Sequence, residues 1–97
     1  MTISRILRVD LYVVDFTAWK KSFDRNLIDR EESGVRRYRV IRSIDDPKHI
    51  MVDLEFDNPG KMEAFLTAVR SLMAMSEMEK IENSLLEVAE TVESKEY

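Results

Sequence analysis

The chain has 97 residues, of which 44% are hydrophobic and 35% charged, a composition typical of one folded domain rather than a disordered chain. It has no cysteine, which excludes disulfides and thiol nucleophiles, and a single histidine, His49, which excludes an imidazole cluster within one copy. The net charge of −4 argues against non-specific binding to nucleic acid. No apolar run approaches roughly 18 residues, and no secretion signal is recognisable, so we expect a soluble, cytoplasmic protein that binds neither nucleic acid nor membrane.

The first third of the chain predicts a strand followed by an amphipathic helix. Residues 7–13 alternate between apolar and polar side chains, which is the two-residue period of a half-buried strand. Asp15 is suited to cap a helix by accepting from amides of its first turn. Gly34 is expected to break the chain after that helix with a positive φ. Apolar residues spaced by three and four predict the buried stripe of the helix: Phe16, Trp19, Phe23 and Leu27.

The middle of the chain predicts a hairpin of two strands, residues 35–44 and 50–56. Asp45-Asp46-Pro47-Lys48 between them predicts a turn, because short carboxylates bond to nearby amides and proline fixes φ. The same turn chemistry accounts for the adjacent carboxylates of Asp45 and Asp46 without a metal ion. His49 beside the turn is expected to be an exposed side chain without a role.

The last part predicts a second helix and a fourth strand. Asn58-Pro59 suits the N-cap and first position of a helix, since proline there lacks only an amide that the helix leaves unbonded. Leu86 and Val88, with Val92 at the outer limit, predict the strand, and residues 93–97 a loose tail. The buried stripe of the helix is expected to comprise Met62, Phe65, Leu66, Val69, Leu72 and Met73.

The order β-α-β-β-α-β predicts an α+β fold in one domain, residues 1–97. With right-handed crossovers it is the ferredoxin-like βαββαβ sandwich, in which a four-stranded antiparallel sheet carries two helices on one face. The other face must then meet water, a ligand or a second subunit. A chain this small buries only about two-thirds of its unfolded surface, so we expect a homodimer.

Side chains of the uncovered face follow from the alternation of the strands. In residues 35–44, Tyr38 and Val40 are placed on the helix side, although Val35 and Ile41 favour the opposite parity. Paired residue numbers in the hairpin must then have an even sum, which sets Arg39 opposite Asp53 or Glu55. The uncovered face is expected to carry Arg8, Asp10, Tyr12, Arg37, Arg39, Ile41, Met51, Asp53 and Glu55.

Two interpretations of this face stay open. It is either a solvated surface of ion pairs worth roughly 0–1 kcal/mol each, or the wall of a cavity closed by a second subunit. In a closed cavity, paired arginines would bind a carboxylate or phosphate, and a carboxylate or tyrosine would exchange protons. The candidate catalytic residues are Asp10, Tyr12 and Asp53. The candidate ligand-binding residues are Tyr12, Arg37, Arg39, Met51 and Glu55, and no spacing suggests a metal site.

Several short motifs resemble the dimeric α+β barrel superfamily, which includes antibiotic-biosynthesis monooxygenases, heme-degrading monooxygenases and many members without assigned activity. The resemblance spans about residues 5–75, whereas residues 76–84 lack the glycine and proline expected before the last strand. It implies a homodimer whose two sheets face each other around a barrel. The motifs are Val14-Asp15-Phe16-Thr17-Ala18-Trp19-Lys20, Phe23-Asp24, Arg30 before Gly34-Val35, Arg42 before Asp45-Asp46-Pro47, Phe56-Asp57 and Ala64-Phe65.

The resemblance also implies a class of function. Ala68 and Ser76 stand where the heme-degrading branch carries a tryptophan and a heme-ligating histidine, so no cofactor is expected. The implied function is a cofactor-independent monooxygenase-like enzyme acting on a small aromatic or polyketide-like molecule in the barrel cavity. The alternatives are a non-catalytic, small-ligand-binding or regulatory homodimer and a plain interaction module. An enclosed pocket with a titratable group would favour the enzyme.

Overall fold

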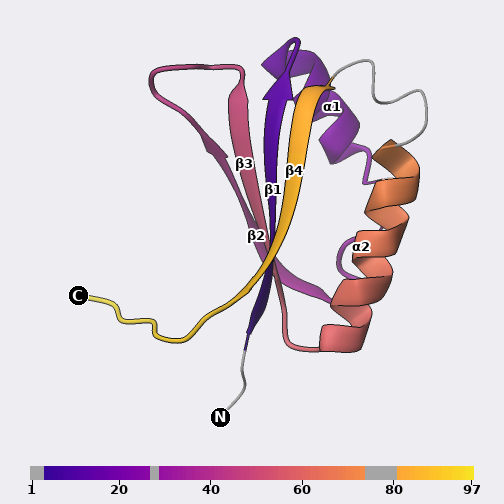
Figure 1. Ribbon diagram of the computed structural model, residues 1–97, viewed down its shortest axis with the longest axis vertical. Coiled ribbons are helices and arrows are strands. Elements are labelled where there is room, and N and C mark those ends of the chain that lie inside the picture. Colours follow the sequence, from indigo (N-terminus) through magenta and orange to yellow (C-terminus); the bar gives the residue numbers. More distant parts are fainter. Residues whose placement is uncertain (1–3, 27–28, 74–80) are drawn as a thin grey trace.

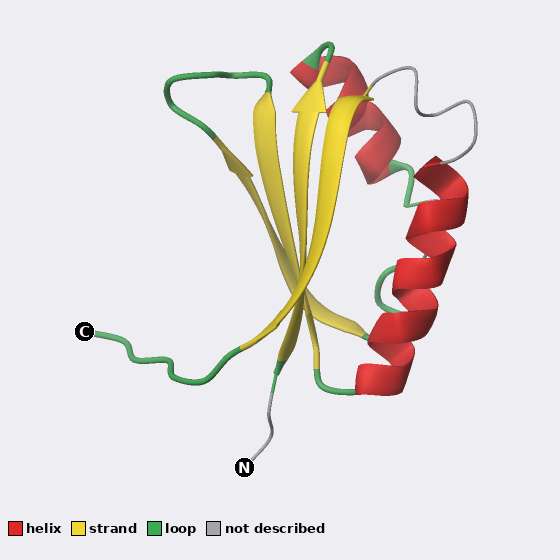
Figure 2. Ribbon diagram, in the orientation of Figure 1, coloured by secondary structure: helices red, strands yellow, loops and turns green. Residues whose placement is uncertain are grey.

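The computed structural model describes residues 4–26, 29–73 and 81–97, without the side chains of residues 72, 73 and 81–83. Its strands form one sheet in the order β2-β3-β1-β4, and all neighbouring strands are antiparallel. Both helices lie on the same side of this sheet (Figures 1 and 2), so the predicted ferredoxin-like α+β fold is confirmed. The elements are β1 (Arg5–Val13), α1 (Phe16–Asp24), β2 (Val35–Arg42), β3 (His49–Phe56), α2 (Pro59–Met73) and β4 (Ile81–Glu90).

The core lies between the sheet and the two helices. Trp19 is 6% exposed and packs against Phe16 and Phe23 at ring-centroid distances of 6.0 and 5.3 Å, so its predicted place in the core is confirmed. Leu72, Met73 and Leu27, which were expected on the helical stripes, lie outside the described side chains. The buried core comprises Leu7, Val9, Leu11, Val13, Trp19, Val35, Ile50, Val52, Leu54, Phe56, Met62, Phe65 and Leu66.

Both predicted helix caps are present. The Thr17 amide donates to Asp15 Oδ1 over 3.1 Å, and the Lys61 amide donates to Asn58 Oδ1 over 3.0 Å. Gly34 has the expected positive φ, +102°. It does not end α1, however, because the chain already leaves the helix at Asn26, whose own φ is +52°. Asparagine tolerates this left-handed conformation. Gly34 instead lies directly before Val35, the first residue of β2.

The hairpin differs from the sequence expectation at both ends of its loop. β2 ends at Arg42 rather than at residue 44, and β3 begins one residue early, at His49. The turn chemistry is as predicted, since the Lys48 amide donates to Asp46 Oδ1 over 3.0 Å. The earlier start of β3 brings His49 into the sheet opposite Tyr12 of β1.

A β-bulge at the start of β2 resolves the conflict over which way this strand faces. The register shifts between Val35, which pairs with Phe56, and Arg37, which pairs with Glu55. The extra residue between them, Arg36, lets Val35 be buried while Arg37 faces away from the helices. The remaining pairs have even sums, so the predicted parity of β2 is confirmed and Arg39 lies opposite Asp53.

β4 is longer than its apolar residues suggested. It begins at Ile81 and pairs along the whole of β1. This pairing extends beyond the apolar residues of β4, because backbone N–H and C=O groups need hydrogen-bond partners whatever side chains β4 carries. Leu86 packs against the core, but Val88 is exposed at this edge strand and Val92 lies beyond it. The exposed tail begins at Thr91, whose amide still donates to the Ser4 carbonyl over 3.0 Å, and its end projects from the sheet (Figure 1).

Candidate functional site

The sheet face that the helices leave uncovered, here termed the open face, carries side chains in rows that run across the strands. The central row alternates in charge, and each of its members lies opposite its neighbours in the register. The row next to it, toward the loop between β2 and β3, is mainly apolar. The charged row is Arg39, Asp53, Arg8 and Glu87, and the apolar row is Ile41, Met51, Asp10 and Leu85.

Two further rows flank these. Beyond the apolar row, His49 of β3 lies opposite Tyr12 of β1. On the other side of the charged row, Arg37 lies opposite Glu55. The open face therefore has an arginine-rich end and an aromatic, titratable end, with apolar side chains between them. The candidate residues of the sequence analysis are all on this face, but Tyr12 and Arg37 lie at opposite ends of it.

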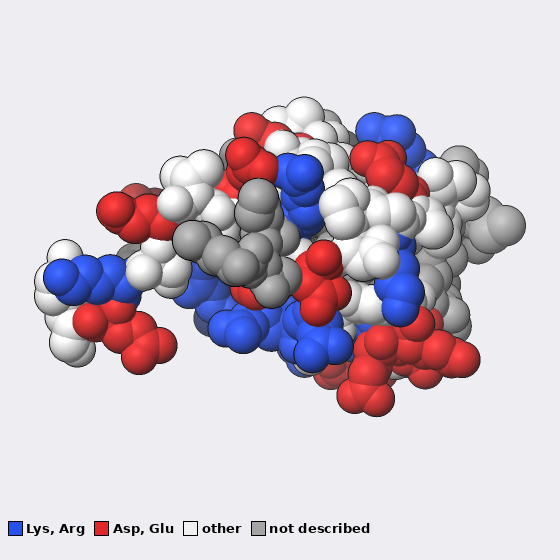
Figure 3. Space-filling model, turned by 90° about the horizontal axis from the view of Figure 1, so that it is seen from below, with Lys and Arg blue, Asp and Glu red and all other residues white. Residues whose placement is uncertain are grey.

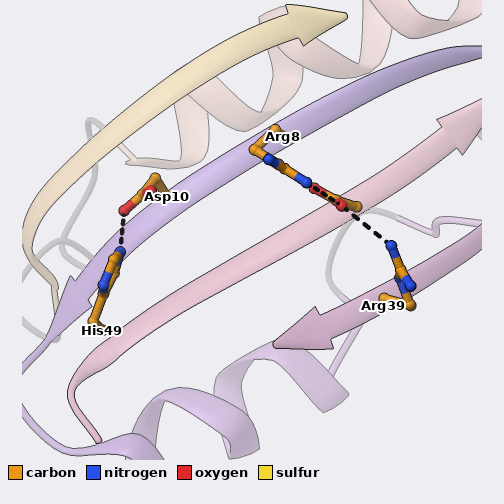
Figure 4. Close-up of polar contacts among 5 residues, drawn as sticks. Arg8, Asp10, Arg39 and His49 are labelled. Carbon is orange, nitrogen blue, oxygen red and sulfur yellow. Dashed lines mark hydrogen bonds and ion pairs between the residues drawn. The ribbon is translucent and has the colours of Figure 1, made fainter. Parts of the chain in front are cut away.

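Asp53 is the centre of the charged row, between Arg8 and Arg39 in the register. Its Oδ1 and Oδ2 accept from Arg8 Nε and Nη2 over 2.7 and 2.8 Å, and Arg39 Nη2 lies 3.8 Å from Oδ2. Figure 4 shows Arg8 and Arg39 pointing toward each other from β1 and β2. The hydrogen bonds from Arg8 lower the pKa of the Asp53 carboxyl, outweighing the opposing effect of burial, and the charges of Arg8 and Arg39 lower it further. An ionised carboxylate with both oxygens engaged is a weak proton acceptor at neutral pH. Asp53 is therefore better suited to holding the arginines in place than to catalysis.

Arg37 and Arg39 are weakly constrained charges of the open face. Their guanidinium nitrogens lie 3.6 and 3.8 Å from Glu55 and Asp53, too far for hydrogen bonds, and their side chains are 76% and 75% exposed. Both line a hollow of about 570 Å³, together with Arg8, Asp53 and Glu55. Figure 3 shows basic side chains gathered on the lower surface of the molecule with acidic side chains beside them.

His49 is the functional candidate that the sequence analysis missed. Its Nε2 lies 2.7 Å from Asp10 Oδ1 (Figure 4). Its ring stacks on Tyr12 with centroids 4.4 Å apart and planes inclined by 7°. The expectation that this histidine is exposed is wrong, since its side chain is 22% exposed. Extending the alternation of residues 50–56 back by one position would have put His49 on the same face as Met51.

The contact with Asp10 fixes how His49 can exchange protons. An ionised carboxylate only accepts hydrogen bonds, so a neutral His49 donates from Nε2 and keeps its lone pair on Nδ1. The pair can therefore act as a general base, with Tyr12 holding the ring in place by stacking.

Within residues 4–26, 29–73 and 81–97, no three histidine or acidic side chains lie close enough together to hold a metal ion. None of the helices in this part of the chain is long and apolar enough to cross a membrane.

Comparison with known proteins finds similarity in structure. No protein-family model and no curated protein matches the chain. A solved protein of unknown function from Nitrosomonas europaea superposes with a TM-score of 0.75 at 19% identity, covering 99% of this chain and 96% of its own. A dimeric ferredoxin-like protein from an uncultured marine organism has a TM-score of 0.76 at 9% identity, covering 100% and 94%.

A third solved structure carries a functional description. It is named "Putative antibiotic biosynthesis monooxygenase from Nitrosomonas europaea", and its TM-score is 0.69 at 18% identity, covering 95% of this chain and 93% of its own. What these proteins share with the chain is the fold. The resemblance to dimeric α+β barrel proteins that the sequence suggested is thereby confirmed at the level of the fold.

Proposed function

We propose that this chain forms a homodimer whose two open faces enclose a cavity, and that it oxygenates a small, electron-rich aromatic molecule there without a cofactor. The observation that carries this proposal is the His49–Asp10 pair stacked on Tyr12, which supplies a general base on the face that a partner would cover. The monooxygenase-like description of a structural neighbour supports the same class of reaction.

Enclosure by a second copy follows from the apolar row. Leu85 is 64% exposed, and Ile41 and Met51 are half-buried on the same face, so a partner would remove apolar surface from water. A neighbour described as a dimeric ferredoxin-like protein supports this arrangement. We also retain the cytoplasmic location expected from the sequence as part of the proposal.

The reaction would begin with transfer of an acidic substrate C–H proton to His49 Nδ1, while the contact of Nε2 with Asp10 holds the ring in place. The substrate anion then reduces O2, and a carbon–oxygen bond forms to give a hydroperoxide after the proton returns. Loss of water from the hydroperoxide leaves a carbonyl, so one CH2 group and one O2 become one C=O group and one H2O. The role of the protein is to bind the substrate, take the proton and return it.

Anthrone provides a direct test, because its acidic CH2 group would become the carbonyl of anthraquinone. We expect the protein to accelerate O2 consumption and anthraquinone formation, and His49→Gln to lower the rate by about 10²-fold or more. Lys48→Gln, the neighbouring exposed position, is the matched control and should leave the rate unchanged. A rate no higher than that of buffer, or equal rates for wild type and His49→Gln, would contradict the proposal.

The charged row favours a second candidate function. Arg8, Asp53 and Arg39 are arranged for binding rather than for proton transfer, as expected of a non-catalytic, ligand-binding or regulatory dimer. Such a protein would bind an aromatic ligand saturably and show no turnover with anthrone. A plain interaction module would show neither saturable binding of an aromatic ligand nor turnover of anthrone.

A further inference from the structure

We propose that the ligand of the open face is an aromatic carboxylic acid, whose carboxylate binds to Arg37 and Arg39 while its opposite end reaches His49. This inference rests on the cavity of the proposed function and names the class of molecule that it would hold. It depends on three features of the open face: two arginines whose contacts with carboxylates of the described residues are ion pairs and not hydrogen bonds, a neighbouring apolar row, and a base at the far end.

Within the described part of the chain, Arg37 and Arg39 contact carboxylates only as ion pairs, at 3.6 and 3.8 Å. Among the described residues, neither Arg37 nor Arg39 makes a hydrogen bond to a carboxylate. Asp53 already accepts twice from Arg8, and Glu55 accepts from Ser4 Oγ at Oε1 over 3.2 Å, while its Oε2 stays 3.6 Å from Arg37 Nε. Enclosing two guanidinium groups without new partners would be costly, so closure of the cavity favours a bound anion.

The spacing of the pair suits one small anion. Arg37 and Arg39 are two residues apart on β2 and face the same way, which separates their backbones by about 7 Å. Long side chains from both positions can converge on a group held over the hollow that they line. A guanidinium group presents parallel donors to the two oxygens of a carboxylate, so a single carboxylate can be bound by both residues.

The acidic residues of the hollow select the charge of the ligand. Asp53, Glu55 and Glu87 line it together with Arg8, Arg37 and Arg39, so its acidic and basic side chains balance. A doubly charged phosphate or a polyanionic nucleic acid would meet repulsion from the three carboxylates. A singly charged carboxylate adds only one negative charge. That charge would lie next to Arg37 and Arg39, whose N–H groups make no hydrogen bond to a carboxylate of the described residues.

The length of the ligand follows from the spacing of residues along β3. His49 and Asp53 are four residues apart on β3, a distance of about 13 Å along the strand. Met51 lies between them and Ile41 lies opposite Met51, which gives an apolar surface for rings to cover. The long arginine side chains shorten the gap, so two or three fused rings would join a carboxylate at Arg39 to an acidic group at His49.

Two naphthalene probes test this inference by calorimetry with the full-length protein. 6-Hydroxy-2-naphthoate carries both the carboxylate and an ionisable hydroxyl, whereas 2-naphthol lacks the carboxylate. We expect the naphthoate to bind wild type at least tenfold more tightly than the naphthol. Arg37→Met and Arg39→Met should each remove most of that difference and leave the affinity for naphthol unchanged.

Arg36→Met is the matched control. Arg36 is also an exposed arginine of β2, but it lies at the bulge and faces Asp57, 3.6 Å away, rather than the hollow. Its variant should bind both probes as wild type does. Circular dichroism spectra like that of wild type would show that each variant is folded.

The outcomes separate this inference from the proposed function. Equal wild-type affinities for naphthoate and naphthol would overturn the carboxylate assignment and leave the enclosed aromatic cavity standing. Unchanged naphthoate affinity in both Arg37→Met and Arg39→Met would also overturn it. Failure of both probes to bind wild type would overturn the cavity and the carboxylate site together.

Discussion

Trp19 contributes to the fold through its packing, since it is 6% exposed and contacts an aromatic residue on either side of it along α1. Trp19→Ala should lower the free energy of unfolding by about 3–5 kcal/mol, because it removes a large buried ring and leaves a cavity. Urea unfolding followed by circular dichroism measures this loss. Lys21→Ala, an exposed position on the same helix, should change stability by less than about 0.5 kcal/mol. An unchanged midpoint in Trp19→Ala would contradict its place in the core.

Asp53 should make stability depend on acid pH. Its pKa is lowered in the folded protein from an ordinary value of 3.8, mainly by hydrogen bonds from Arg8. The stability that this carboxylate contributes is therefore fully present above about pH 4, and it is lost as the pH falls through the lowered pKa. Asp53→Asn should cost about 1–3 kcal/mol at neutral pH, because it weakens charge-assisted hydrogen bonds, and less in strong acid.

Urea unfolding of wild type and of Asp53→Asn, at neutral pH and below about pH 3, measures how far the difference between their free energies of unfolding shrinks in acid. Asp57→Asn is the control, because Asp57 is exposed and its closest approach to Arg36 is 3.6 Å. A stability difference between wild type and Asp53→Asn that is the same at both pH values would show that Asp53 is not held ionised by Arg8.

Gly34 lies directly before β2 and has a positive φ. Its φ of +102° is unfavourable for any residue with a Cβ atom, and an added Cβ would lie 2.7 Å from Lys61 Cδ. Gly34→Ala should therefore lower the free energy of unfolding by more than about 1 kcal/mol. Ser33→Ala, one residue earlier, should have an effect below about 0.5 kcal/mol in the same denaturation experiment. Equal effects of the two substitutions would exclude a backbone cause.

The sequence predicted those features of the elements that depend on short-range patterns. Alternation gave β1 and β3, spacing of three and four gave the helices, and side-chain oxygens at Asp15 and Asn58 gave both caps. The start of β4 could not be predicted in this way, because its length follows from pairing with β1. The same limit applies to the site, since the contact between His49 and Asp10 joins residues 39 positions apart and depends on the exact end of a loop.

The molecule as a whole should be a dimer, because its sheet is covered by helices on one side only (Figure 2). We expect light scattering at micromolar concentration to give a mass near twice 11.4 kDa, with an interface of well over roughly 1,000 Å² in total. Leu85→Glu introduces a charge into the apolar row and should shift the mass toward that of the monomer. Ala64→Glu, on exposed surface of α2, should leave the dimer intact. A wild-type mass near 11 kDa would contradict the proposed enclosure.

The bulge in β2 also determines how this chain can change in length. Arg36 is the one residue of the strand without a partner in the register with β3, so its deletion would join Val35 to Arg37 in a regular strand. All other side chains would keep their faces, whereas deletion of Val40 would exchange the faces of the residues on one side of it. Insertions and deletions in relatives should therefore be tolerated at Arg36. An alignment of this chain with a relative that lacks the extra residue therefore needs a gap at Arg36. Without that gap, the alignment would match buried residues of one protein with open-face arginines of the other.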